Sequence, residues 1–471
     1  MENFQAEIGI IGLATMGSNL ARNIAGKGFK VVVYNRTPEV TQEFLEQYKS
    51  DKLQGETDLK KFINQLALPR KIILLIKAGE PVDAVINSLL PLLSVGDTII
   101  DCGNSHFRDS MRRSETLKSK QINFVGCGVS GGEIGALNGP SLMFGGNGTS
   151  WQQLQAMFQA IAAKDFALGP CVAYVGDNGA GHYVKMVHNG IEYAIMQLLA
   201  ESYQILKKVY GLKPNEIAEV FKGYNQKELN SYLMGISAEI LEHKDDLAEG
   251  FMIDKILDQA EQKGTGKWTV TDALDRGVTV STISEAVFAR VTSANKQKRT
   301  EISKRYQKEN PAVKIFFTDF VEILEKALLA GILISYSQGF DLLQLANKEQ
   351  GWQIDLAELA RIWQGGCIIR AKILQNLFEA YKPAGNKSKH LFELPEFSGL
   401  IADGTDSLRQ VVGIGLDNAL AIPGFTNSLL YFDSMTSTEL SANFIQGLRD
   451  YFGAHTYQRN DRPGTFHTKW N

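Results

Sequence analysis

Near the start of the 471-residue chain stands Glu7-Ile-Gly-Ile-Ile-Gly-Leu-Ala-Thr-Met-Gly17, the stretch from which the fold can be inferred. Its first seven residues predict a buried strand, and residues 18–27 predict a helix that ends at Gly28. Residues 30–34 predict a second strand. A strand, glycine turn, helix and strand within about 30 residues are typical of dinucleotide-binding units, because glycines let the backbone approach the pyrophosphate at the helix N-terminus. Ala14 replaces the middle glycine of the usual motif, so the context carries the prediction.

The residues after the second strand indicate which cofactor is expected. Enzymes that use NAD usually have a carboxylate here, which accepts a hydrogen bond from the ribose 2′-hydroxyl, whereas a 2′-phosphate requires an arginine and no acid. This chain has the neutral Asn35 followed by Arg36 and Thr37. We therefore expect NADP rather than NAD.

Further apolar runs at residues 71–76, 98–101 and 123–127 alternate with helical patterns and predict a doubly wound, Rossmann-like parallel sheet. The polar residues Lys77, Asn104 and Ser130 follow these runs, at the strand ends where open α/β sheets bind ligands. Ser130 belongs to Gly128-Val-Ser-Gly-Gly132. This turn either presents several amide groups to a carboxylate or is simply flexible, and the residues alone leave both interpretations open.

Residues 179–210 predict a long helix with an apolar face and a narrow polar stripe. The positions of the inward stripe recur at steps of three or four and are Val184, Val187, Ile191, Ile195, Leu198 and Ser202. The polar stripe consists of Lys185, His188, Asn189 and Glu192. Taken singly, Lys185 is typical of a solvated lysine and His188 of a core histidine. Four polar side chains on one stripe of an otherwise apolar helix predict instead a buried helix that lines a pocket.

From there to about residue 430 the pattern is helical, and it contains a weak internal repeat. Lys185-Met-Val-His-Asn-Gly-Ile191 resembles Lys326-Ala-Leu-Leu-Ala-Gly-Ile332, and Phe221-Lys-Gly223 resembles Trp363-Gln-Gly365 at nearly the same offset. The second copy has apolar residues in place of the polar stripe. We therefore expect a duplicated helical unit of which only the first copy performs chemistry.

Three parts are expected from this organisation. A dinucleotide-binding domain covers residues 1–178, and an all-helical substrate and dimerisation domain covers residues 179–434. A C-terminal tail covers residues 435–471 and is predicted to be a helix followed by a glycine- and aromatic-rich segment. Disordered tails are poor in aromatic residues, so we expect this tail to dock on a surface, either of its own subunit or of another.

The overall composition narrows the class of protein. A net charge of -3 argues against nucleic acid or an anionic membrane as the main partner. No apolar run approaches the ~18 residues of a membrane span, and no signal peptide is visible at the N-terminus. The four cysteines show no Cys-x-x-Cys pairing, so neither a disulfide framework nor a zinc site is suggested and a cytoplasmic location is expected.

Two further clusters lie in the helical region. Lys263-Gly-Thr-Gly-Lys-Trp268 has the composition of an anion-binding loop, with two lysines, a hydroxyl and glycines. Arg290 is the one arginine on an otherwise apolar helical stretch, residues 285–290, where it could also serve as a structural ion pair.

These motifs together resemble one family, the decarboxylating 6-phosphogluconate dehydrogenases, over essentially the whole chain. The resemblance rests on the Gly17 and Asn35 motifs, on Gly-Val-Ser-Gly-Gly-Glu133, Lys-Met-Val-His-Asn-Gly-Ile-Glu-Tyr193 and Lys-Gly-Thr-Gly-Lys-Trp268, and on Leu-Arg-Asp-Tyr-Phe-Gly-Ala-His455. One difference is Glu261, which stands where the family usually has a small residue.

The resemblance implies an enzyme that oxidises 6-phosphogluconate with NADP and releases CO2 and ribulose 5-phosphate, without a metal. Lys185 is the implied general base and acid, and Glu192 the second acid. The implied cofactor-binding residues are Gly12, Ala14, Met16, Gly17, Asn35, Arg36, Thr37, Lys77 and Asn104. The implied substrate-binding residues are Asn104, Ser130, Gly131, Gly132, His188, Asn189, Tyr193, Lys263, Thr265, Arg290, Arg449 and His455. The resemblance also implies a homodimer in which the tail carries Arg449 and His455 into the neighbour's site.

Two rival functions are considered. A smaller β-hydroxyacid dehydrogenase would act on an unphosphorylated substrate without decarboxylation, but Lys263, Arg290 and Arg449 would then have no phosphate to bind. A catalytically inactive NADP-binding regulator would not need an intact Lys185 and Glu192.

Overall fold

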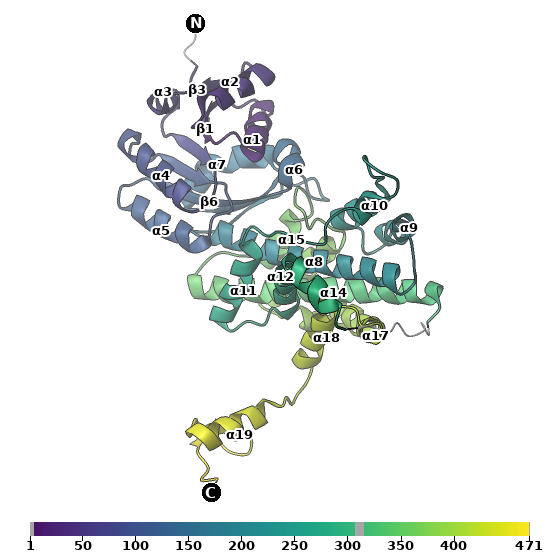
Figure 1. Ribbon diagram of the computed structural model, residues 1–471. Coiled ribbons are helices and arrows are strands. Elements are labelled where there is room, and N and C mark those ends of the chain that lie inside the picture. Colours follow the sequence, from purple (N-terminus) through teal and green to yellow (C-terminus); the bar gives the residue numbers. More distant parts are fainter. Residues whose placement is uncertain (1–3, 307–314, 471) are drawn as a thin grey trace.

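The computed structural model describes residues 4–306 and 315–470, and a twisted sheet forms the N-terminal part of the molecule (Figure 1). The sheet has eight strands in the order β3-β2-β1-β4-β5-β6-β7-β8. The strands are β1 (Ile8–Ile11), β2 (Val31–Tyr34), β3 (Leu53–Glu56), β4 (Lys71–Leu74), β5 (Thr98–Asp101), β6 (Asn123–Ser130), β7 (Ser141–Gly145) and β8 (Val172–Gly176).

The first six strands are parallel, as the alternation of strands and helices predicts. Beyond the strands expected from the sequence the sheet has two more, and the first of them changes direction: β7 pairs antiparallel with β6, and β8 then runs parallel to β7. The reason is the connection between β6 and β7, which contains only the short helix α6 (Gly132–Asn138). So short a connection favours an antiparallel neighbour, since parallel strands need a crossover of a dozen or more residues.

Helices cover both faces of the sheet, which makes it doubly wound. Alternate residues of the strands divide between two apolar cores: Ile10 packs with helices α1, α2 and α7, whereas Ile11 packs with α3, α4 and α5. The helices are α1 (Thr15–Gly26), α2 (Pro38–Gln47), α3 (Leu59–Asn64), α4 (Glu80–Leu89), α5 (Phe107–Lys118) and α7 (Gly148–Ile161). Burial on both faces explains why the strand sequences are almost uniformly apolar.

The region after β8 is helical throughout the part of the chain that the structure describes, apart from a short hairpin in the tail. Its centre is the pair of long helices α8 (Ala180–Lys208) and α14 (Phe317–Gln350), which pack against each other. The other helices are α9 (Pro214–Asn225), α10 (Tyr232–Glu242), α11 (Thr265–Arg276), α12 (Ser281–Ala294), α13 (Lys296–Ser303), α15 (Leu356–Ile362), α16 (Ile373–Tyr381), α17 (Pro395–Asp417) and α18 (Pro423–Met435). Both α8 and α14 are followed by two shorter helices, an order that supports the predicted duplication. No helix among the described residues is long and apolar enough to cross a membrane.

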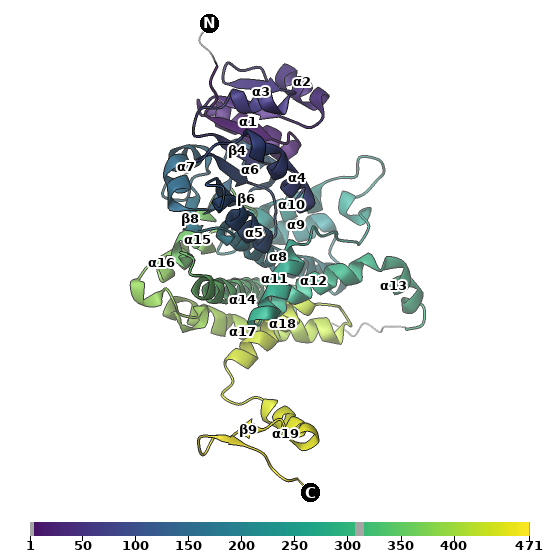
Figure 2. The same ribbon diagram turned by 90° about the vertical axis from the view of Figure 1, so that its left-hand side faces the viewer.

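The tail stands away from the rest of the molecule in both views (Figures 1 and 2). It consists of helix α19 (Ala442–Gly453) and a hairpin of β9 (Tyr457–Gln458) and β10 (Thr465–Phe466). The tail is held together by the buried Asp450, whose carboxylate accepts hydrogen bonds from the Thr456 and Thr468 amides and from Trp470 Nε1. Outside this small core, α19 exposes Phe444, Ile445, Leu448 and Phe452.

Candidate active site

The polar stripe of α8 faces the end of strand β6, inside the molecule. Lys185 is buried, and its Nζ donates a hydrogen bond to Ser130 Oγ at 3.0 Å. Gly128 on the same strand leaves no room for a side chain, because an added Cβ would lie 2.6 Å from Lys185 Cβ. The close approach of strand and helix that this glycine permits brings the lysine to the carboxyl end of the sheet.

His188 connects the members of the stripe. Its Nε2 lies 3.3 Å from Ser130 Oγ, and its Nδ1 lies 3.4 Å from Lys185 Nζ and 3.2 Å from Asn189 Oδ1. Asn189 Nδ2 in turn donates to Thr265 Oγ1 at 3.0 Å, which joins the stripe to the N-terminal end of α11. The predicted loop around Lys263 therefore meets the helix at this threonine.

The pKa values of Lys185 and Glu192 are shifted in opposite directions. Burial lowers the pKa of Lys185, although the nearby Glu192 carboxylate opposes this effect. Burial raises the pKa of Glu192, against the charges of Lys185 and Arg290. Burial and the Lys185 charge hold the pKa of His188 well below its ordinary value. These shifts move the lysine toward its neutral form, a proton acceptor, and the carboxyl toward its protonated form, a proton donor, on one helix face.

Arg290 lies over the ring of Tyr193, with its guanidinium carbon 3.5 Å from the ring centroid. One guanidinium nitrogen donates to the backbone oxygen of Glu261 at 3.0 Å. No ion pair to Arg290 is present among the described residues, which contradicts the alternative that this arginine is a structural ion pair. Glu261 contacts the arginine through its main chain, and its side chain is exposed. Lys263 is also exposed, near the same end of α11.

The turn after Ser130 is packed and not merely flexible. Gly131 has φ +123°, and a Cβ there would collide with the Gly366 carbonyl oxygen. Gly366 belongs to the second helical copy, whose Trp363 packs edge-on against His188 at 5.4 Å between ring centroids. The sequence analysis did not predict that Gly366 and Trp363 of the second helical copy pack against the site. The repeated motif at residues 363–365 was a usable signal, but it did not indicate contact with the site.

A pocket lies along the carboxyl ends of β1, β2 and β4, with a volume of about 590 Å³. Six of the expected cofactor-binding residues line it: Gly12, Ala14, Asn35, Arg36, Thr37 and Lys77. Gly17 packs against Gly12, where a Cβ would collide with the Gly12 carbonyl oxygen, and neither Gly17 nor Met16 is part of the lining.

This pocket fits a dinucleotide with a 2′-phosphate. The first turn of α1 has no side-chain cap and no acidic residue, so its amides are available to an anion. Among the described residues that line the pocket, Arg36 and Lys77 are cationic and none is acidic. Asn35 Oδ1 accepts a hydrogen bond from the Leu13 amide at 3.2 Å, which joins the end of β2 to the glycine turn.

Three predicted site residues lie outside the contacts described above: Asn104, Arg449 and His455. Asn104 is exposed in the loop between β5 and α5. Arg449 and His455 are exposed in the tail, which stands apart from the body that contains Lys185 (Figure 1). For Arg449 and His455 the expected route to a site is through a second subunit.

A dinucleotide pocket on a doubly wound sheet, together with a buried lysine and a half-buried carboxyl on one face of a helix in the adjoining region, defines a dinucleotide-dependent dehydrogenase. Residues 7–176 match the family model described as the NAD binding domain of 6-phosphogluconate dehydrogenase, and residues 181–470 match that of its C-terminal domain. The chain belongs to the 6-phosphogluconate dehydrogenase family.

Individual relatives agree with this membership. The chain is 46% identical to 6-phosphogluconate dehydrogenase, decarboxylating, of Staphylococcus aureus over 464 residues, covering 98% of this chain and 99% of that protein. It is 47% identical to the Lactococcus lactis protein of the same description over 470 residues, 99% of each chain. The solved 6-phosphogluconate dehydrogenase of Plasmodium falciparum, described in its apo form and in complexes with NADP+ and with 6-phosphogluconate, superposes with a TM-score of 0.95 at 43% identity and covers 98% of this chain and 100% of its own.

Proposed function

We propose that this protein oxidises 6-phosphogluconate with NADP and decarboxylates the product to ribulose 5-phosphate. The observation that carries the proposal is the buried Lys185 and the half-buried Glu192 on one face of α8, with pKa values shifted toward neutral lysine and protonated carboxyl. Family membership and the complexes described for the Plasmodium falciparum relative support the same substrate and cofactor.

Lys185 performs two proton transfers in the proposed mechanism. NADP, when bound, supplies the acceptor for the hydride that leaves C3 of the substrate. Neutral Lys185 takes the proton of the C3 hydroxyl as the ketone forms. The resulting β-keto acid loses its C1 carboxyl group as CO2, and the protonated Lys185 returns its proton to the ketone oxygen as charge develops there. The electron pair released from the broken bond is held as an enediol.

Glu192 completes the reaction. Its protonated carboxyl donates to the carbon that lost the carboxylate, while the hydroxyl on the neighbouring carbon releases its proton to solvent, from which Glu192 is protonated again. These two steps convert the enediol into the ketose. The acid lies about two turns from the base along the same helix face, so both act on one bound molecule. Ser130 and His188, which contact Lys185 Nζ, hold the lysine in place for both transfers.

The remaining polar residues bind substrate in this proposal. Residues 130–132 and Asn189 hold the sugar acid, and Asn104 reaches it from the β5–α5 loop. Tyr193, Lys263, Thr265 and Arg290 hold the phosphate end, where Arg290 already lies over Tyr193. Lys263 and Arg290 provide the positive charge that a phosphate requires.

The proposed working unit is a cytoplasmic homodimer. The exposed apolar side chains of α19 are typical of a segment that docks on another molecule, and a symmetric dimer is the commonest assembly. In the dimer, Arg449 and His455 of each tail complete the phosphate site of the other subunit.

The test is to measure NADPH absorbance together with CO2 release in the presence of 6-phosphogluconate, with NADP and NAD compared. The proposal expects one CO2 per NADPH and a preference for NADP. NADPH without CO2 would indicate the rival β-hydroxyacid dehydrogenase. Cofactor binding without turnover would indicate the inactive regulator.

A further inference from the structure

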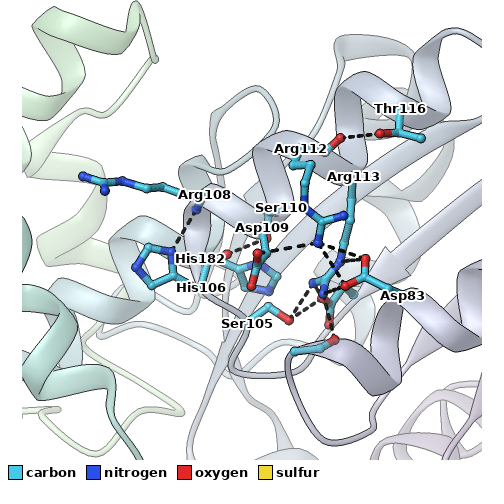
Figure 3. A network of polar contacts seen from close by, with 12 residues as sticks. Asp83, Ser105, His106, Arg108, Asp109, Ser110, Arg112, Arg113, Thr116 and His182 are labelled. Carbon is cyan, nitrogen blue, oxygen red and sulfur yellow. Dashed lines mark hydrogen bonds and ion pairs between the residues drawn. The ribbon is translucent and has the colours of Figure 1, made fainter.

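A buried arginine lies between the two loops that follow β4 and β5, and it has no part in the proposed chemistry. Arg113 on α5 is 2% exposed, and all of its nitrogens are engaged. We call the Arg113 cluster the set formed by Arg113, Asp83, Asp101, Ser105 and the Gly79 carbonyl. Figure 3 shows Arg113 between Asp83 and Ser105.

The cluster joins two separate loops. On one side Arg113 Nε donates to Asp83 at 2.9 Å, and its Nη2 donates to Asp83 at 3.0 Å and to the Gly79 oxygen at 2.9 Å. On the other side Nη1 donates to Ser105 Oγ at 3.2 Å and to Asp101 at 3.4 Å. Ser105 Oγ also donates to Asp101 at 2.6 Å. A planar guanidinium can make these bonds at fixed angles, which a flexible ammonium cannot.

Each of the two joined loops carries a residue that is expected to bind a ligand. Lys77 stands two residues before Gly79 and lines the cofactor pocket, and Asn104 stands immediately before Ser105. Strands β4 and β5 are neighbours in the sheet, so both loops emerge from the same edge. Helix α5 is in turn bonded to the catalytic helix, because Ser110 Oγ lies 2.6 Å from His182 Nδ1, three residues before Lys185 (Figure 3).

We propose that Arg113 is a positioning residue that fixes the β4–α4 and β5–α5 loops relative to each other, so that Lys77 and Asn104 are ordered before the cofactor binds. This inference rests on the proposed function for the identity of the cofactor. Arg113 itself lies beneath the loops and touches no ligand. The hydrogen bond to Arg113 is the main cause that lowers the pKa of Asp83 to about 2, so the pair stays charged at any working pH.

Arg112 provides a matched control. It donates to both oxygens of the same Asp83, at 2.9 and 3.1 Å, but its side chain is 55% exposed and contacts neither Gly79 nor Ser105. Replacing Arg112 by lysine thus takes a guanidinium away from the same carboxylate and keeps the positive charge, without releasing the loops. The body of α4 is held independently, by the buried Val82, Ile86 and Leu89.

The experiment measures the binding of NADP and of adenosine 2′,5′-bisphosphate by calorimetry, for the wild type, Arg113→Lys and Arg112→Lys. The bisphosphate probes the Arg36 end of the pocket, which follows β2 and belongs to neither of the two loops that Arg113 joins. We expect Arg113→Lys to bind NADP roughly tenfold more weakly, because Lys77 and Asn104 must then be ordered on binding. Its affinity for the bisphosphate should be unchanged, and Arg112→Lys should match the wild type for both ligands.

Equal weakening of both ligands would show general loosening and overturn the proposal, as would unchanged NADP binding in Arg113→Lys. If Arg113→Lys does not fold, Ser105→Ala removes one partner of the guanidinium and should weaken NADP selectively in the same way; unchanged binding there overturns the proposal. A wild-type protein that does not bind NADP would instead contradict the proposed function, so the two failures are distinguishable.

Discussion

At the scale of single residues, Lys185 is the centre of the proposed chemistry. Lys185→Ala should lower kcat by about 10²–10⁴, the usual contribution of a positioned acid–base group. Substrate should still bind, because Arg290 and the other phosphate contacts remain. The measurement is steady-state NADPH formation with a separate binding assay for 6-phosphogluconate.

Lys207→Ala is the control for this variant, because Lys207 lies on the same helix and pairs with Asp254 near the surface. It should keep wild-type turnover. Near-normal turnover of Lys185→Ala would remove the lysine from the mechanism.

Arg36 is the single residue expected to make the protein bind NADP more tightly than NAD. A charged hydrogen bond contributes roughly 1.5–3 kcal/mol, so Arg36→Ala should weaken NADP binding by about 10- to 150-fold. NAD has no 2′-phosphate, and its affinity should change little. Calorimetric titration of both cofactors tests this, with the exposed Lys60 of α3 replaced by alanine as a control for lost positive charge. An equal loss of affinity for NADP and NAD would contradict the assignment.

At the scale of elements, a buried carboxyl on the catalytic helix α8, that of Glu201, joins this helix to α18. Glu201 accepts hydrogen bonds from the amides of Gly424 and Phe425, at 2.7 and 2.9 Å, at the N-terminal end of α18. Burial raises the pKa of Glu201 to about 7, although these hydrogen bonds oppose the shift. Helix α18 leads directly to the tail, so this contact connects the catalytic helix to the base of the tail.

The raised pKa of Glu201 predicts a pH dependence of stability. Between the ordinary glutamate value and about 7 the folded protein binds more protons at this group than the unfolded chain does. Its contribution to the free energy of unfolding is therefore complete at low pH and falls as pH rises through about 7, by up to ~1.4 kcal/mol per pH unit.

Glu201→Gln cannot titrate and should lose this dependence. Denaturant unfolding of both proteins at several pH values between 5 and 8 checks it, at about equal protein concentration because a dimer is expected. The difference in unfolding free energy, wild type minus variant, should decrease with rising pH. A constant difference would show that Glu201 is ionised throughout.

At the scale of the whole molecule, each proposed site is formed by two subunits, because the tail of one subunit completes the site of the other. Mixing Lys185→Ala with Arg449→Ala should restore activity, because a hybrid dimer pairs an intact Lys185 from one chain with an intact Arg449 from the other. With random exchange, half of the dimers are hybrids with one working site of two, about a quarter of wild-type specific activity.

The control is each variant incubated alone, which should stay inactive. Exchange of subunits is verified independently by mixing differently labelled chains. If exchange occurs and activity does not return, Arg449 acts within its own chain and the tail is not shared.

The sequence alone determined the local elements and their chemistry. The Gly12 turn between two apolar strands predicted the dinucleotide unit, because glycine geometry and strand burial are encoded locally. The polar stripe of α8 was visible for the same reason, since helical periodicity brings Lys185 and Glu192 onto one face regardless of what surrounds them.

Only the tertiary structure decided what these residues meet. The edge contact of Trp363 with His188 and the hydrogen bonds of Arg113 join segments that are distant along the chain. The antiparallel pairing of β7 depends on how a short connection turns back onto β6. A buried arginine and an exposed one look alike in sequence, as Arg113 and Arg112 do, because burial depends on the neighbours that folding supplies. The placement of Gly366 beneath Gly131 likewise depends on two backbones approaching in space, which no periodicity encodes.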